Sequence, residues 1–132
     1  MTTSSKDLLD HALGSSPRNA EAGRRALVSR AYYAAYHRCR EWARALPRSS
    51  AASAESRGVH QRLIDRLADP PRTWSRQKRV LSIWLSERLE VLRERRVRAD
   101  YRLEQKVSEV ETRAQQEEAR AVFDCCNGLR KP

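Results

Sequence analysis

SRAYYAAYH, residues 29–37, is the stretch that decides the fold, because it lies in the middle of a long run without proline. Residues 18–46 are rich in alanine and arginine, which are strong helix formers, and their periodicity predicts one long helix from Arg18 to Leu46. Pro17 precedes this run, at a position typical of the first turn of a helix. At about 100° per residue, one face is apolar and wide enough to be buried. That face holds Val28, Tyr32, Ala35, Cys39, Trp42 and Leu46.

A basic stripe lies about half a turn away on the same predicted helix. It consists of Ala26, Arg30, Tyr33, His37, Arg40 and Arg44. The stripe has three interpretations: a solvated charged face, a homodimer interface anchored by tyrosine and arginine, or a groove in which guanidinium groups neutralise phosphates and a tyrosine stacks on a base. For the third interpretation, the candidate nucleic-acid-binding residues are Arg30, Tyr33, Arg40, Arg44 and, later in the chain, Arg98.

Four further segments have helical periodicity. We expect a short helix capped by Ser4 or Ser5 and ended by Gly14, a helix from Ser56 to the stop at Asp69-Pro70-Pro71, a long helix over 75–101, and a last helix over 108–127 ended by Gly128. Residues 47–54, PRSSAASA, are expected to form a loop. No alternating strand pattern occurs, so the sequence predicts an all-α, antiparallel bundle of four to five helices forming a single domain over residues 1–132.

The expected core of these segments follows from the same periodicity. Phe123 is expected to point out of the core, and Arg88, Arg95 and Arg96 interrupt the apolar stripe of residues 75–101, so they must be paired or reach water. The residues expected to be buried are Leu8, Leu9, Ala12, Leu13, Val59, Leu63, Ile64, Leu67, Leu81, Trp84, Leu85, Leu92, Ala99, Val107, Val110, Ala114, Ala121, Val122 and Cys125, with Leu89 at the margin.

Composition points to a polyanionic partner. The chain has 27 Lys and Arg against 17 Asp and Glu, a formal net charge of +10, and a pI of about 10.4. Most of the positive charge is arginine, whose planar fork matches phosphate, and we therefore expect RNA as a partner. The sequence has no signal peptide and no apolar run long enough to span a membrane, so we expect a cytoplasmic protein without membrane contact. The cysteines and His11 form no recognisable ligand set, and we expect neither a metal nor a cofactor.

Motif searches exclude several catalytic classes, because the chain has no glycine-rich phosphate loop, no paired-carboxylate signature and no nucleophile elbow. A chemistry that needs only arginine, histidine and tyrosine remains: metal-independent cleavage of RNA, in which the 2′-hydroxyl attacks the adjacent phosphate. A histidine or tyrosine would move the proton and an arginine would stabilise the developing charge. The candidate catalytic residues are Arg96 with Tyr101, and Arg30 with His37.

Three motifs resemble the HEPN domain family of prokaryotic helical-bundle proteins. They are SRAYYAAYH at 29–37, SRGV at 56–59 and RVRADY at 96–101, followed by a final helix rich in Ala and Glu. The resemblance implies a bundle of four or five helices, often a homodimer, found in toxin-antitoxin and phage-defence systems. It also implies a partner protein, such as a nucleotidyltransferase. Active members of the family cut RNA with an arginine followed four to six residues later by a histidine.

The chain departs from that catalytic pattern. Five residues after Arg96 stands Tyr101 instead of histidine, Arg30 and His37 lie in the helix that carries the aromatic motif, and Arg57 and His60 are too close in sequence. Two hypotheses follow: a module that binds RNA or docks a partner protein, and a ribonuclease with altered chemistry. Arg96 and Asp100 are four residues apart and can pair on one helix, so we expect a structural role for Arg96.

Overall fold

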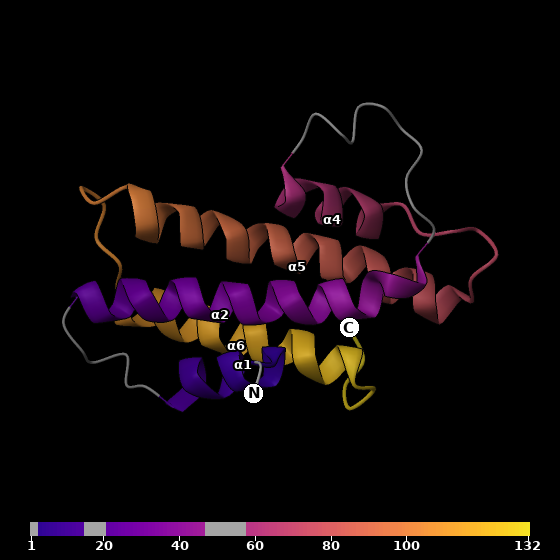
Figure 1. Cartoon of the computed structure of the whole chain (residues 1–132), viewed down its shortest axis with the longest axis horizontal. Coiled ribbons are helices and arrows are strands. Elements are labelled where there is room, and N and C mark those ends of the chain that lie inside the picture. Colours follow the sequence, from indigo (N-terminus) through magenta and orange to yellow (C-terminus); the bar gives the residue numbers. More distant parts are fainter. Residues whose placement is uncertain (1–2, 15–20, 47–57) are drawn as a thin grey trace.

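The computed structural model describes residues 3–14, 21–46 and 58–132, and within these residues it is an all-helical bundle without strands (Figure 1). The elements are α1 (Ser5–Gly14), α2 (Glu21–Trp42), the 3-10 helix η1 (Ala43–Ala45), α4 (Val59–Ala68), α5 (Arg76–Tyr101) and α6 (Glu109–Cys126). Packed neighbours run antiparallel, among them α1 with α2, α2 with α5, α4 with α5, and α5 with α6 (Figure 1). The predicted all-α bundle is confirmed. No described helix is long and apolar enough to cross a membrane.

The helix that contains SRAYYAAYH is the centre of the bundle, since α2 packs against α1, α5 and α6. Its predicted apolar face is buried over Val28, Tyr32, Ala35 and Cys39. Tyr36 is buried as well, so the buried face is wider than predicted. The α-helix ends at Trp42, and the tighter η1 leads to Leu46, which is buried. The predicted helix start at Arg18 with Pro17, the loop 47–54 and the Ser56 cap lie outside the described residues.

The helices α1, α5 and α6 each begin with a serine N-cap. In each, the serine hydroxyl oxygen accepts a hydrogen bond from a backbone N–H of the first turn. Ser75 Oγ accepts from the N–H of Lys78 at 3.2 Å, and Ser108 Oγ accepts from the N–H of Glu111 at 3.1 Å. Before α1, Ser4 Oγ accepts from the N–H of Asp7 at 3.1 Å. The exception is α4, whose N-cap is Gly58, without a side-chain cap.

The long α5 contributes the leucines at the centre of the core. Leu85, Leu89 and Leu92 are fully buried, so Leu89 is a core residue and not a marginal one. The carbonyl groups at the end of α5 have no hydrogen-bond donor within the helix. Arg25 of α2 supplies a donor for them. Its Nη1 donates to the carbonyl of Ala99 at 2.9 Å. The end of α5 is thereby fixed to the beginning of α2.

The buried face of α6 differs from the predicted one. Phe123, expected to point outward, is 4% exposed and belongs to the main core, whereas Val110 is 78% exposed. The physical reason is that three polar side chains, Thr112, Gln115 and Gln116, occupy the buried face, which rotates the helix away from the purely apolar stripe. In α4, Val59 is likewise exposed at 53%, because it lies in the first turn, ahead of the buried Leu63, Ile64 and Leu67.

Candidate nucleic-acid interface

Two of the motifs meet in space, although more than sixty residues separate them in the sequence. Nη2 of Arg96, on α5, donates to the hydroxyl of Tyr33, on α2, at 2.6 Å. Nε of Arg96 lies 2.8 Å from Oδ2 of Asp100, which confirms the predicted ion pair. The N–H of Nε is not aimed well enough at this oxygen to form a hydrogen bond. Ser29 Oγ donates to the same Oδ2 at 3.2 Å. We call Ser29, Tyr33, Arg96 and Asp100 the Arg96 network.

A second group of side chains adjoins this network and brings in α4. The hydroxyl of Tyr32 lies 2.6 Å from Nδ1 of His60, in a hydrogen bond between α2 and α4. The His60 ring also packs against the ring of Tyr36, with centroids 4.3 Å apart, and meets the edge of Tyr33 at 5.9 Å. We call Tyr32, Tyr33, Tyr36 and His60 the His60 cluster. Tyr33 belongs to both groups and joins them.

The surroundings of His60 favour its neutral form. Partial burial is the largest cause that lowers the pKa of His60, and the positive charges of Arg93, Arg96 and His37 lower it further. Burial raises the pKa of Tyr32 far above its usual value, which keeps its hydroxyl protonated. A protonated tyrosine hydroxyl can donate to an unprotonated Nδ1. The cluster therefore holds a neutral imidazole beside arginine at neutral pH.

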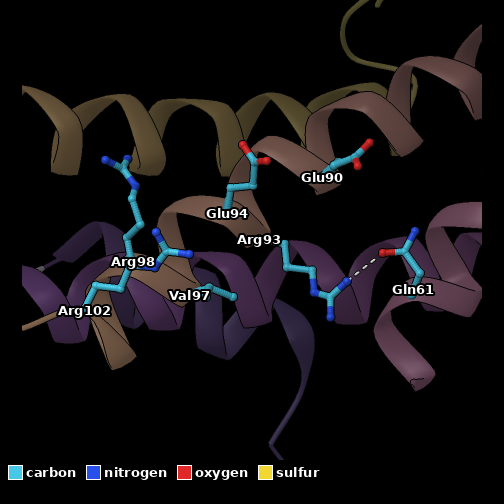
Figure 2. A pocket seen from close by; sticks show the side chains of 7 residues that line it. All are labelled: Gln61, Glu90, Arg93, Glu94, Val97, Arg98 and Arg102. Atoms are coloured by element: carbon cyan, nitrogen blue, oxygen red, sulfur yellow. Dashed lines mark hydrogen bonds between the residues drawn. The ribbon is translucent and has the colours of Figure 1, made fainter. Parts of the chain in front are cut away.

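A groove of about 460 Å³ opens between α4 and α5, where Gln61 follows His60 in the sequence (Figure 2). Nη1 of Arg93 donates to Oε1 of Gln61 at 2.8 Å across it. Figure 2 shows the guanidinium of Arg93 turned toward Gln61, while the carboxylates of Glu90 and Glu94 point in the opposite direction. The full lining consists of Gln61, Glu90, Arg93, Glu94, Val97, Arg98 and Arg102. Its side next to Gln61 is therefore cationic.

The predicted nucleic-acid-binding residues divide between solvent and the bundle. Arg30, Arg40 and Arg44 are exposed, as a phosphate contact requires. Tyr33 is partly buried and bonded to Arg96. Arg98 lines the groove and is paired with Glu111 of α6. The exposed arginines share a helical stripe with Tyr33, so this stripe borders the His60 cluster.

Neither predicted catalytic pair is joined by a hydrogen bond between described residues. Tyr101 is 68% exposed, and its ring lies 5.3 Å from Cζ of Arg96, in a cation–π contact. His37 is partly buried and packs edge-on against Tyr36, with ring centroids 5.2 Å apart. The guanidinium of Arg96 is instead held by Tyr33 and Asp100.

The sequence did not predict that His60, Tyr36 and Arg93 belong to the candidate site. His60 stands three residues after Arg57, which is closer than the four to six residues of the family's Arg–His spacing, and Arg57 lies outside the described residues. A spacing in the sequence identifies only arginines on the same helix as the histidine, whereas the arginines near His60 come from α5. Tyr36 gave a signal in SRAYYAAYH, since it follows Tyr32 by four residues and so lies on the same helix face.

The other arginines that interrupt α5 are paired with an acidic residue on α6. Arg88 Nη1 donates to Glu118 Oε1 at 2.7 Å, and Arg95 is bonded to the other oxygen of Glu118. These contacts join α5 to α6 on the side away from α4. Among the described residues, no group of three or more histidine, cysteine or acidic side chains is arranged to hold a metal ion.

Comparison with protein-family models, with curated proteins and with solved structures gives no match for this chain. Two of the motifs singled out in the sequence, SRAYYAAYH and RVRADY, contribute residues to the Arg96 network.

Proposed function

We propose that this chain is a HEPN-like helical module that binds RNA, with the basic stripe of α2 and the groove beside Arg93 contacting phosphates. The observation that carries the proposal is the position of Arg96. The Arg96 side chain is only 17% exposed, and its guanidinium is paired with Asp100 and bonded to Tyr33, so Arg96 acts as a positioning residue. The exposed Arg30, Arg40 and Arg44 remain available for a polyanion.

The affinity for RNA is expected to depend strongly on salt, because binding releases counterions from the phosphates. A fluorescence titration of a single-stranded RNA oligonucleotide at several salt concentrations measures this dependence. Removing two phosphate contacts in the double variant Arg30→Ala/Arg40→Ala should weaken binding and lower the slope of log affinity against log salt by about one to two.

The matched control is Arg113→Ala/Arg120→Ala. These two arginines are exposed on α6, which does not pack against α4, and the variant removes the same charge. The control should retain most of the affinity. Equal weakening in both double variants would mean that only net charge matters, and an absence of binding at low salt would contradict the proposal outright.

A second candidate function, metal-independent cleavage of RNA, is favoured by one observation: a neutral His60 lies beside Arg93 and Arg96. In the tautomer whose Nδ1–H donates to the Tyr32 oxygen, the free Nε2 of His60 would accept the proton of the 2′-hydroxyl while an arginine stabilises the charge on phosphate. The test measures cleavage of RNA in the presence of a metal chelator, with a 2′-deoxy substrate as the negative control. Loss of cleavage in His60→Gln, with RNA binding retained, would support this function; a protein that binds but never cleaves would exclude it.

The resemblance also extends the proposal to partners and location. We propose a cytoplasmic component of a toxin-antitoxin or phage-defence system, working with a nucleotidyltransferase or another protein of that system, and forming a homodimer through the exposed basic stripe of α2. Isologous pairing would bring two copies of the stripe together as one composite groove. Sedimentation as a monomer at high protein concentration would contradict the homodimer.

A further inference from the structure

Two cysteines far apart in the sequence meet where α2 packs against α6. Cys39 on α2 is fully buried. Cys126, the last residue of α6, is partly buried and packs against the core cluster that contains Cys39. The residues next to them are in direct contact, since Nη2 of Arg38 donates to Oδ1 of Asn127 at 2.8 Å, and each thiol lies close enough to perturb the other. Cys125 is buried too, but it lines a separate cavity near the C-terminal residues, together with Arg76 and Leu129.

The two thiols are chemically unequal. Interaction with the Cys39 thiol is the largest cause that lowers the pKa of Cys126, and the charge of Arg38 lowers it further, against opposing effects of burial and Glu41. The same interaction and complete burial raise the pKa of Cys39. Cys126 is therefore the thiolate-forming, partly accessible member, and Cys39 is the buried partner.

Arg38 is fixed beside Cys126 by contacts at the end of α6. Its Nη2 donates to Oδ1 of Asn127 at 2.8 Å, and its Nη1 lies 3.7 Å from Oε2 of Glu41. The negative end of the α6 dipole opposes a thiolate at this position, so a nearby guanidinium matters for its formation. A low-pKa thiol with a second thiol in contact is the usual arrangement of a redox-sensitive cysteine.

We propose that Cys126 and Cys39 form a reversible disulfide between α6 and α2 in response to peroxide. The thiolate of Cys126 attacks one oxygen of hydrogen peroxide, the O–O bond breaks, and hydroxide leaves while Cys126 becomes a sulfenic acid. Cys39 then loses its proton and attacks the Cys126 sulfur, the S–O bond breaks, and water leaves. The two thiols together lose two electrons, and one peroxide becomes two waters.

The bridge would close a loop that contains α4 and α5. The helix that carries His60 and the helix that carries the groove arginines Arg93 and Arg98 both lie inside this loop. A cross-link over so long a loop restricts the unfolded chain strongly and raises the melting temperature. Oxidation would therefore stabilise the bundle without altering any residue of the proposed RNA interface.

The test is mass spectrometry of the full chain after treatment with hydrogen peroxide. The wild type should lose the mass of two hydrogens, proteolytic mapping should join the Cys39 peptide to the Cys126 peptide, and dithiothreitol should reverse both results. The melting temperature should rise on oxidation and fall again on reduction. Cys125→Ser is the matched control and should behave as the wild type, whereas Cys126→Ser should neither cross-link nor gain thermal stability.

A second variant traps the intermediate. In Cys39→Ser, whose hydroxyl can still donate to the Cys126 sulfur but cannot form a disulfide, peroxide should leave a sulfenic acid on Cys126 that dimedone labels, with little label on Cys125. Three results would overturn the proposal: a cross-link that joins Cys125 instead of Cys39, a cross-link only between molecules, or a wild-type chain in which Cys39 and Cys126 stay reduced. None of these readouts involves RNA, so this inference stands or fails separately from the proposed function.

Discussion

The hydroxyl of Tyr32 lies 2.6 Å from Nδ1 of His60, and this contact ties the central helix α2 to the short helix α4. Tyr32 is fully buried, so its hydroxyl has no access to water as an alternative partner. Losing the bond leaves a buried polar atom unpaired, which costs more than losing an exposed bond. The contact therefore contributes to both the stability of the bundle and the position of His60.

Tyr32→Phe should lower the free energy of unfolding by about 1 kcal/mol, because it removes this hydrogen bond while keeping the ring. Urea denaturation followed by circular dichroism measures the change. Tyr101→Phe is the control, since Tyr101 is 68% exposed and should change stability very little. Equal stability of Tyr32→Phe and the wild type would show that the contact carries no net energy.

Arg96→Ala should destabilise the bundle by about 1–2 kcal/mol, because it leaves Asp100 without its cation and Tyr33 without its donor. Thermal melting measures the loss, and Arg30→Ala, at an exposed position of α2, should change stability by less than about 0.5 kcal/mol. RNA binding per folded molecule should remain unchanged in Arg96→Ala.

The alternative role of Arg96 in catalysis predicts a different result. If Arg96 and Tyr101 cleaved RNA, Arg96→Ala and Tyr101→Phe would both abolish a metal-free cleavage activity of the wild type with little loss of stability. We expect no such joint loss, because the Tyr101 ring only stacks near the guanidinium. An active wild type with two inactive, stable variants would refute the structural role.

Gln115→Ala should lower the free energy of unfolding by about 2–3 kcal/mol, which is more than most substitutions in α6 would do. Gln115 is fully buried, and its Nε2 donates to the carbonyl groups of Leu92 at 2.9 Å and Val28 at 3.2 Å. The substitution removes both bonds and leaves a cavity between three helices. Glu117→Ala, at an exposed position of the same helix, is the matched control for helix propensity. Comparable urea midpoints for the two variants would contradict this role.

As the pH decreases, the free energy of unfolding of the wild type should fall more steeply than that of His60→Gln. Burial and nearby arginines hold the pKa of His60 below its ordinary 6.5 in the folded protein, so the unfolded chain takes up a proton first as the pH falls. The contribution of His60 to stability is therefore complete above pH 6.5 and is lost as the pH falls from there through the folded pKa.

Thermal melts at several values between about pH 7.5 and about pH 5 test this expectation, because the variant cannot titrate at position 60. The difference in melting temperature between the two proteins should change over this range. A constant difference would show that the folded and unfolded states bind the proton at His60 equally well.

Periodicity predicted the architecture well because apolar spacing alone decides most of it. The helices α2 and α5, the helix starts near Ser75 and Ser108, and the Arg96–Asp100 pair all follow from neighbours within a few residues. These are local effects, and a sequence displays them directly.

The face of α6 could not be predicted in the same way. Gln115 reads as a surface residue in a sequence, yet it is buried because backbone carbonyl groups of two other helices accept its hydrogen bonds. The placement of Phe123 in the core follows from that rotation. The His60 cluster was missed for a related reason, since its members come from helices whose packing the sequence does not state.

The attachment of α4 bears on how the molecule opens. This ten-residue helix packs mainly on α5, whereas α2 is enclosed by three helices. Amide hydrogen exchange should therefore be faster in α4, through partial opening, and slowest in α2, which becomes accessible only when the whole bundle unfolds. Because α4 carries His60, the groove beside Arg93 can widen to admit a ligand by a movement of one helix, while the other four keep their arrangement.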